Sequence, residues 1–436
     1  MKKKWFYLVA ILALTSCAED AFEDGSSQDA GIPQEIKLSA GTRGIEVASR
    51  GKGSIGDIDG SDANKWSGQK INIWCFKRDL ASFTLPQDGT RDEAGIYLKG
   101  ETATADQEAT ISTLSFSPSI FYPLTGAYHF VGYYIDDITP DTPEIDTTTG
   151  DVLVPITVNG TQDVMIAESA LTYEQKVALI EELNDNNKIE YTNLTEVIDA
   201  EGNLVANYAS KGIVEDEFDK AFSSYTARRQ VQPNLVFNHQ LAKLNFKIKA
   251  GDEKTYAKTD DNGKKLGVYV TGITVKSLTT ANIRITKDGK ISFADMANES
   301  ALSVGKKGDN GVIGALTSVG DLKEGTPTPD QVGEGLLVIP ATSYTANITV
   351  NQEWDSSGQT QIPAGEQSKN YEDISLTIDG GFKAGFSYDI IITVYSNQEI
   401  NITATLTGWK EGGEIEVSPE DQEWEQNTNG TTGGTN

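Results

Sequence analysis

The residue types that most often carry catalysis are few in this chain, and their spacing matches no common active site. Its 436 residues include only two histidines, His129 and His239, and each lies within an apolar, strand-like run. The first interpretation of both is therefore a packed or hydrogen-bonded core residue. No histidine–cysteine cluster has metal-site spacing, and no nucleophile-elbow pattern stands out. We expect neither an enzyme nor a bound cofactor.

Two patterns in one glycine-containing segment come closer to known ligand sites. Residues 51–56 (GKGSIG) formally match G-x-G-x-x-G, but no strand precedes them and no helix follows, so the phosphate-binding context is missing. Asp57, Asp59 and Asp62 offer the clustered carboxylates that Ca²⁺ prefers. Their spacing is not that of an EF-hand. A solvated turn is the simpler interpretation, with Ca²⁺ binding as the alternative, and no metal site is predicted.

The charge balance excludes one class of partner. The formal net charge is −28 and the sequence pI is about 4.4. A nucleic-acid-binding protein needs a basic stripe that neutralises phosphates, and this sequence has none. The acidic surface is typical of a soluble, exposed protein.

The N-terminus has the pattern of an export signal. Three lysines follow Met1, and an apolar run of ten residues, 5–14, follows them. That run is too short to span a bilayer, which needs about 20 apolar residues, but it fits a secretory signal peptide. The run ends in Leu-Thr-Ser-Cys at Cys17, which resembles the lipobox of bacterial lipoproteins. We therefore predict lipidation of Cys17 and a signal peptide over residues 1–17. An ordinary signal peptide with a chance cysteine is the alternative.

The residues after Cys17 predict a tether. Residues 18–33 are polar and begin with an acidic stretch that resembles the surface-export signal of Bacteroidetes lipoproteins. The other cysteine is Cys75, so acylation of Cys17 would leave no intramolecular disulfide. We expect Cys75 to be a small, buried apolar residue.

Alternation of apolar and polar residues dominates the rest of the chain and predicts strands with one face on a core and one in water. The clearest runs are 70–76, 244–249, 268–275 and 400–407. The Asp288-Gly289 pair between two apolar runs predicts a hairpin. Short strands with frequent turn signals favour β-sandwiches over parallel sheets.

One segment departs from this pattern. Thr172 and Gln175 have the spacing of a helix capping box, and apolar residues then follow at helical intervals, namely Tyr173, Val177, Ile180 and Leu183. The segment 168–228 therefore predicts one amphipathic helix and a long polar connection.

Several stretches together resemble the fimbrillin family, the Mfa-like type V pilins of Bacteroidales. Besides the lipobox, the motifs are 66–74 (WSGQKINIW), 122–134 (YPLTGAYHFVGYY), 162–167 (QDVMIA), 237–246 (FNHQLAKLNF), 337–340 (LVIP), 382–388 (FKAGFSY) and Trp409. Gln69 and Asn72 stand where the family pattern has Asp and Gly, and Ile135 replaces a proline. The order of the motifs over residues 17–410 is more specific than any one of them.

The resemblance implies an all-β fold of two tandem transthyretin-like β-sandwich domains with one short helical insertion. The expected domains are residues 34–230, with the insertion near 168–228, and 231–410. Residues 411–436 form a polar tail. The implied location is the cell outer membrane, facing outward, and the implied partners are other fimbrial subunits.

The resemblance also implies that a protease cutting after arginine removes an N-terminal strand, whose place a neighbouring subunit's strand then fills. Arg43 and Arg50, in a glycine-rich segment after a possible strand at 35–38, are the candidate sites. They are otherwise two solvated loop arginines. The tail offers only Ile415 and Val417 as an alternating apolar pair, so a tip or anchor subunit is an alternative to a stalk subunit.

A function of another class fits the same fold. A surface lipoprotein that binds glycan or host matrix without polymerising would use exposed aromatic side chains, since rings stack on sugars. The candidates are Trp66, Trp354 and Trp424.

Overall fold

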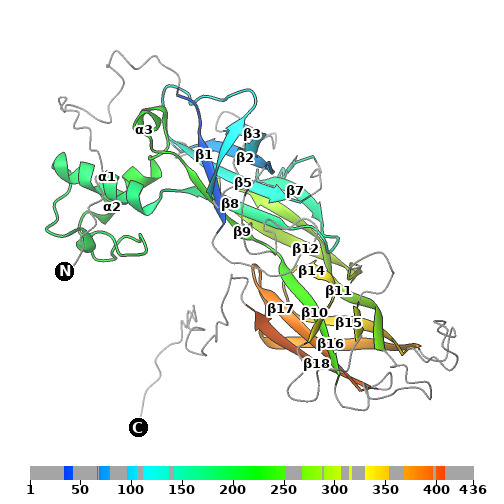
Figure 1. The fold of residues 1–436 in the computed structure, drawn as a ribbon. Helices are drawn as coiled ribbons and strands as arrows, with labels where there is room; N and C mark the ends of the chain where they lie inside the picture. Colours follow the sequence, from blue (N-terminus) through cyan, green and yellow to red (C-terminus); the bar gives the residue numbers. More distant parts are fainter. Residues whose placement is uncertain are drawn as a thin grey trace, which may run out of the picture. The chain divides into compact units, whose positions relative to one another are not determined.

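The computed structural model shows an all-β protein with a small helical part, which confirms the predicted fold class (Figure 1). It describes residues 34–42, 66, 68–78, 96–106, 111–136, 142–250, 268–286, 289–305, 314–316, 329–352, 368–395 and 399–407. The predictions on the tether, on the tail and on six single residues lie outside the described residues and stay predictions; these residues are Cys17, Arg43, Arg50, Asp57, Asp59 and Asp62.

Seven strands close into a barrel. Their order around it is β1 (Leu38–Thr42), β4 (Ile111–Phe116), β3 (Ile96–Ala105), β2 (Lys70–Lys77), β5 (Tyr128–Ile135), β8 (Val164–Ala170) and β9 (Asn234–His239), which pairs with β1 again. The β1–β9 pair is parallel, whereas the other pairs described in the barrel are antiparallel. The predicted strand at 70–76 is confirmed as β2, with Ile71 and Ile73 fully buried. Cys75 is also fully buried, as expected, and burial raises the pKa of its thiol.

The other strands form two sheets that pack like a sandwich. One has the order β14 (Asp330–Val338), β10 (Ala242–Ala250), β17 (Ser387–Tyr395) and β18 (Glu399–Thr407). The other has the order β16 (Ser368–Phe382), β15 (Ala341–Gln352), β11 (Val268–Ile285), β7 (Val152–Thr157) and β6 (Glu144–Ile145), while β12 (Ile291–Ser303) and β13 (Gly314–Leu316) also pair with β11. One buried apolar cluster contains Leu244 and Ile390 of the first sheet and Ile273 and Ile348 of the second. The apolar faces of both sheets therefore share one core.

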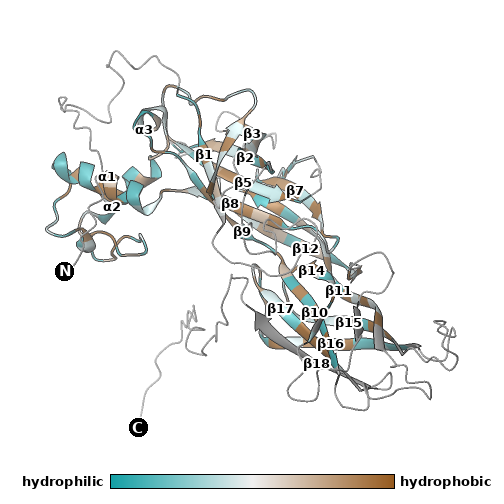
Figure 2. Ribbon diagram, viewed as in Figure 1, coloured by the Kyte–Doolittle hydropathy of each residue, from teal (hydrophilic) through white to brown (hydrophobic). Residues whose placement is uncertain are grey.

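The hairpin and alternation signals are visible in these sheets. The predicted hairpin at Asp288-Gly289 joins β11 to β12, where Ile285 pairs with Ile291 and Gly289 has a φ of 81°. This φ lies in the left-handed region, which glycine adopts without steric cost. Figure 2 shows hydrophilic and hydrophobic residues next to one another along the strands, as expected for elements with one face on a core.

The chain forms two compact units. The β unit contains the barrel and both sheets. The helical unit contains the described residues up to Ile36, Phe121–Ala127 and Leu171–Val231. Its helices are α1 (Tyr173–Asp185), the 3-10 helix η2 (Leu194–Glu196), α2 (Lys211–Asp219) and α3 (Ser224–Arg228).

The helical unit differs in part from the prediction. The capping box of α1 is confirmed, because the Thr172 Oγ1 accepts the Gln175 N–H at 3.3 Å and the Gln175 Oε1 accepts the Thr172 N–H at 2.9 Å. The predicted polar connection is wrong, since it contains η2, α2 and α3. Its few apolar residues complete a separate small core, which consists of Ile180, Leu183, Ile189, Val197, Ile198 and Val214. Within the described part of the chain, no helix is long and apolar enough to cross a membrane.

The predicted domain boundary at residues 230–231 stays a prediction. Strands from its two sides share sheets: β9 follows the boundary and lies in the barrel, while β7 precedes it and pairs with β11.

Candidate functional site

Strand β1 is a short wall of the barrel held on both edges. Residues Leu38 to Gly41 pair with Leu114 to Ile111 of β4 in antiparallel register, and Ser39 to Thr42 pair with Asn234 to Phe237 of β9 in parallel register. The Ser39 N–H donates to the Pro233 carbonyl at 3.1 Å, and the Ser39 hydroxyl donates to the Asn234 Oδ1 at 2.8 Å. Removal of β1 would leave the edges of β4 and β9 without backbone partners.

The inward face of β1 is fully buried. Leu38 and Ala40 are both 0% exposed, and Ser39 between them is half-buried. Burial of one leucine side chain stabilises a fold by about 1.5–3 kcal/mol. β1 is therefore held in the barrel by backbone hydrogen bonds to two strands and by the buried side chains of Leu38 and Ala40.

The barrel interior beside β9 is filled by aromatic rings. The Trp66 ring centroid lies 5.0 Å from that of Phe237 and 5.7 Å from that of Tyr134. A Cβ on Gly132 would lie 3.2 Å from the Phe237 ring, so this glycine makes room for the packing. Because Trp66 is 0% exposed, its proposed role as a sugar platform is wrong. Trp354 and Trp424 lie outside the described residues.

Two motifs far apart in the sequence meet in a buried polar cluster. The Asp163 Oδ2 lies 2.5 Å from the His239 Nδ1, and both side chains are buried. The Asp163 Oδ1 accepts the Val164 N–H at 2.8 Å, and the Asp163 N–H donates to the Asp136 Oδ2 at 3.3 Å. The Asp136 Oδ1 in turn accepts the Tyr134 hydroxyl. The cluster fixes the end of β9 to β8, which supports the structural interpretation of His239.

Lys243 lies close to this cluster with 1% of its surface exposed. Desolvation lowers the pKa of its ammonium group to about 8, and the charge of Asp163 opposes this shift. A Cβ on Gly335 would lie 2.4 Å from the Lys243 Cε, so a larger residue at that point of β14 would require the Lys243 side chain to move. Asn245, on the same strand, donates to the Ser387 hydroxyl at 2.8 Å. The expectation that the polar face of residues 244–249 meets water is therefore wrong for Asn245, which is 4% exposed.

His129 is the other histidine, and it is also buried. Its Nδ1 lies 3.3 Å from an Arg78 nitrogen and 3.3 Å from the Ser169 hydroxyl. A Cβ on Gly289 would lie 3.1 Å from the His129 ring, so the tip of the β11–β12 hairpin packs on it. These contacts support its interpretation as a core residue.

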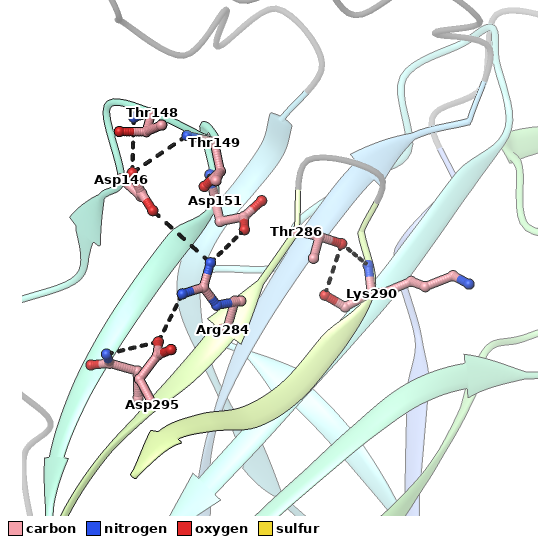
Figure 3. A network of polar contacts seen from close by, with 9 residues as sticks. Asp146, Thr148, Thr149, Asp151, Arg284, Thr286, Lys290 and Asp295 are labelled. Carbon is pink, nitrogen blue, oxygen red and sulfur yellow. Dashed lines mark hydrogen bonds and ion pairs between the residues drawn. The ribbon is translucent and has the colours of Figure 1, made fainter. Parts of the chain in front are cut away.

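A second polar network ties β6, β7, β11 and β12 together (Figure 3). The Arg284 Nη1 lies 2.9 Å from the Asp151 Oδ2 and 4.0 Å from the Asp146 Oδ2. Its Nη2 lies 2.8 Å from the Asp295 Oδ2, which also accepts the Asn282 amide at 3.1 Å. The hydrogen bond from Arg284 is the main cause that lowers the pKa of Asp295.

The remaining hydrogen bonds in Figure 3 are made within two turns of the backbone. The Asp146 Oδ1 accepts the Thr148 N–H at 2.8 Å, which is the main cause of its lowered pKa. The Thr286 and Lys290 contacts close the β11–β12 hairpin (Figure 3). Three carboxylates thus share one guanidinium, and the arrangement is a cross-strand tie. Among the described residues, no group of histidine, cysteine or carboxylate side chains is arranged to hold a metal ion.

The structure places the sequence-predicted sites as follows. β1 ends at Thr42, so the described segment 34–42 ends directly before Arg43. Sequence reasoning placed this strand at 35–38 and missed its position in the barrel, because short strands carry little periodic signal. It also missed the Asp163–His239 contact, although both residues stand in motifs singled out above.

No family model and no curated protein matches this sequence. Solved structures do show similarity. A candidate cell adhesion protein from Bacteroides uniformis has 14% identity and a TM-score of 0.39, over 88% of this chain and 100% of that chain. A fimbrial assembly protein from Parabacteroides distasonis has 11% identity and a TM-score of 0.33, over 86% and 99%. A candidate polysaccharide-binding protein from Bacteroides thetaiotaomicron has 10% identity and a TM-score of 0.31, over 86% and 97%.

The first two of these structures are thus described as a cell adhesion protein and a fimbrial assembly protein. Because their TM-scores lie below 0.5, the proposals below rest on the residues of this chain.

Proposed function

We propose that this chain is a structural or adhesive subunit of cell-surface fimbriae that assembles by β-strand exchange. The proposal rests mainly on β1, a barrel strand with a fully buried face. β1 ends at Thr42, the residue directly before Arg43. The proposal includes export as a lipoprotein, lipidation of Cys17 and a location at the cell outer membrane. Its partners are other fimbrial subunits, with host protein or glycan as the adhesive target.

The mechanism follows from the position of β1. A cut after Arg43 or Arg50 would break the covalent connection between β1 and the strands that follow it in the barrel. When β1 leaves, β4 and β9 expose unpaired backbone groups beside the apolar sites of Leu38 and Ala40. Such an edge takes up an extended segment of another chain, because the ladder gives affinity and the alternate side chains give specificity.

The tail of the chain itself supplies a segment of this kind. Residues 414–419 read EIEVSP, and residues 35–40, which include most of β1, read EIKLSA. Ile415 and Val417 would take the places of Ile36 and Leu38. This similarity supports a second copy of the chain as one partner in exchange. Pro419 would take the place of Ala40 and, since it lacks an N–H, would end the ladder there.

A surface lipoprotein that binds glycan or host matrix without polymerising remains the second candidate. It shares the export signal and the fold but makes no use of β1. It predicts that the chain binds polysaccharide with its barrel intact and forms no polymers after cutting.

Arg-specific proteolysis of residues 17–436 tests the proposal. We expect a cut at Arg43 or Arg50 with an intact body, read by mass spectrometry of the new N-terminus. After a wash in mild denaturant that releases the N-terminal fragment, the body should form oligomers or fibres, read by gel filtration and electron microscopy. The variant Val417→Asp should be cut but remain monomeric, whereas Glu416→Ala, at the position matching the exposed Lys37, should behave like the wild type. A body that shatters, or a washed body that takes up no strand, refutes strand exchange.

A further inference from the structure

Residues 34–36, directly before β1, make contacts separate from those of β1 itself. Within the helical unit, the Tyr122 N–H donates to the Gln34 carbonyl at 2.8 Å. Glu35 forms an antiparallel bridge with Phe121, and Ile36 is only 2% exposed. The hydrogen bond and the bridge are both made between residues of the helical unit.

All of these contacts join a residue that precedes Arg43 to a residue that follows it. The segment 34–36 is held by Phe121 and Tyr122, and β1 is held by β4 and β9. A cut after Arg43 breaks one peptide bond and none of these contacts. The cut therefore changes the connection of β1 to the body, but not its binding.

The order of events follows from this. We propose that β1 stays bound after the chain is cut, so that displacement of β1 by a competing strand, and not the cut itself, controls exchange. This rests on the proposed function and adds its regulation: a cut subunit remains closed, attached to its own N-terminal segment, until a better or more concentrated strand arrives. The lipid predicted at Cys17 would then keep the cut body at the membrane through the non-covalent contacts of residues 34–42.

The structure also ranks the competing strands. The best occupant is an extended segment of nine residues with apolar side chains at the positions of Ile36 and Leu38 and a small side chain at that of Ala40, which are all buried. The chain's own tail is a poorer match. Val417 is one methylene smaller than Leu38, and Pro419 removes a ladder donor at Ala40. Together these differences make the tail bind β1's site at least about tenfold more weakly than β1 itself.

The test uses the full chain with residues 45–49 replaced by a site for a sequence-specific protease, so that cutting does not depend on Arg43 or Arg50. After the cut, we expect the N-terminal fragment to co-elute with the body in gel filtration, as read by mass spectrometry. A labelled peptide of residues 34–42 (QEIKLSAGT) should replace it slowly, and the peptide of residues 413–421 (GEIEVSPED) should compete at least about tenfold less well.

A matched pair of variants distinguishes the contribution of residues 34–36 to fragment binding from a general loss of stability. Ile36→Ser should accelerate release of the cut fragment, while Lys37→Ser, at an exposed neighbour, should leave the release rate unchanged. The uncut variants report folding, because their strand remains covalently attached.

The outcomes distinguish the two proposals. If the wild-type fragment leaves during chromatography while the washed body still takes up strands, exchange stands and retention is wrong. If the fragment stays but no strand ever replaces it, strand exchange is refuted. Equal competition by the two peptides would overturn the ranking of the strands.

Discussion

Leu38 offers the sharpest test of how β1 is held in the barrel. Its side chain is 0% exposed and lies on the inward face of a strand with ladder partners on both sides. Truncating a fully buried leucine to alanine costs about 2–5 kcal/mol, because the lost transfer energy adds to the cavity left behind. A cost of about 3 kcal/mol corresponds to about a hundredfold weaker binding of the strand.

This magnitude can be measured directly on the cut protein. Fluorescence anisotropy would compare two labelled peptides, QEIKLSAGT and its Leu38→Ala form, on a body washed free of its own fragment. The matched control is Lys37→Ala, which changes an exposed side chain and should alter affinity by less than about threefold. If the Leu38→Ala peptide binds within threefold of the wild type, β1 is not held by the buried side chain of Leu38, and the reasoning for strand exchange fails.

Three further predictions concern the buried polar residues. Asp163→Ala should lower the free energy of unfolding by about 1–3 kcal/mol, because it removes the buried hydrogen bonds that the Asp163 carboxylate makes with His239 and with the Val164 N–H; denaturant titration measures this. The pKa of Lys243, lowered to about 8, means that the unfolded chain binds the extra proton between that pH and the usual lysine range. Stability should therefore rise as pH increases from about 8 toward 10, and Lys243→Met should flatten that slope. Gly335→Ala should destabilise the protein, because its Cβ would lie 2.4 Å from the Lys243 Cε.

Each of these predictions has its own control. Asn238→Asp changes an exposed neighbour of His239 and should have a small effect. An unchanged slope in the Lys243→Met protein would show that another group titrates there. Shortening the side chain in Lys243→Ala should rescue Gly335→Ala in part, since the two share one space; strictly additive costs would contradict the steric account.

The class of fold could be predicted from the sequence because strand periodicity is local. The residues Leu244, Phe246 and Ile248 alternate with polar residues, and all three are buried as this pattern predicts. The capping box of α1 is also local, since both of its residues lie within one turn. These features follow from side-chain direction along a single element.

What could not be predicted depends on pairing between distant residues. Nothing near Lys243 in the sequence indicates that its charged end is buried, because the cause lies in Asp163 and in the space left by Gly335. Likewise, the two apolar positions of β1 are too few to show a period. Its antiparallel partner β4 and its parallel partner β9 both come from distant segments of the sequence. Trp66 looked like an exposed aromatic residue because its neighbours are polar, although its ring packs against Phe237.

The pairing of β1 with β9 has a consequence for how this protein is made. Ser39 and Asn234, which share a hydrogen bond, are separated by 195 positions in the chain. The N-terminus is synthesised first, so β1 exists long before residues 234–237, with which it pairs in parallel. Contacts of such long range form late, because the entropy of closing the loop must be overcome first. The β1–β9 pair of each copy therefore cannot be complete until the chain has been synthesised as far as Phe237.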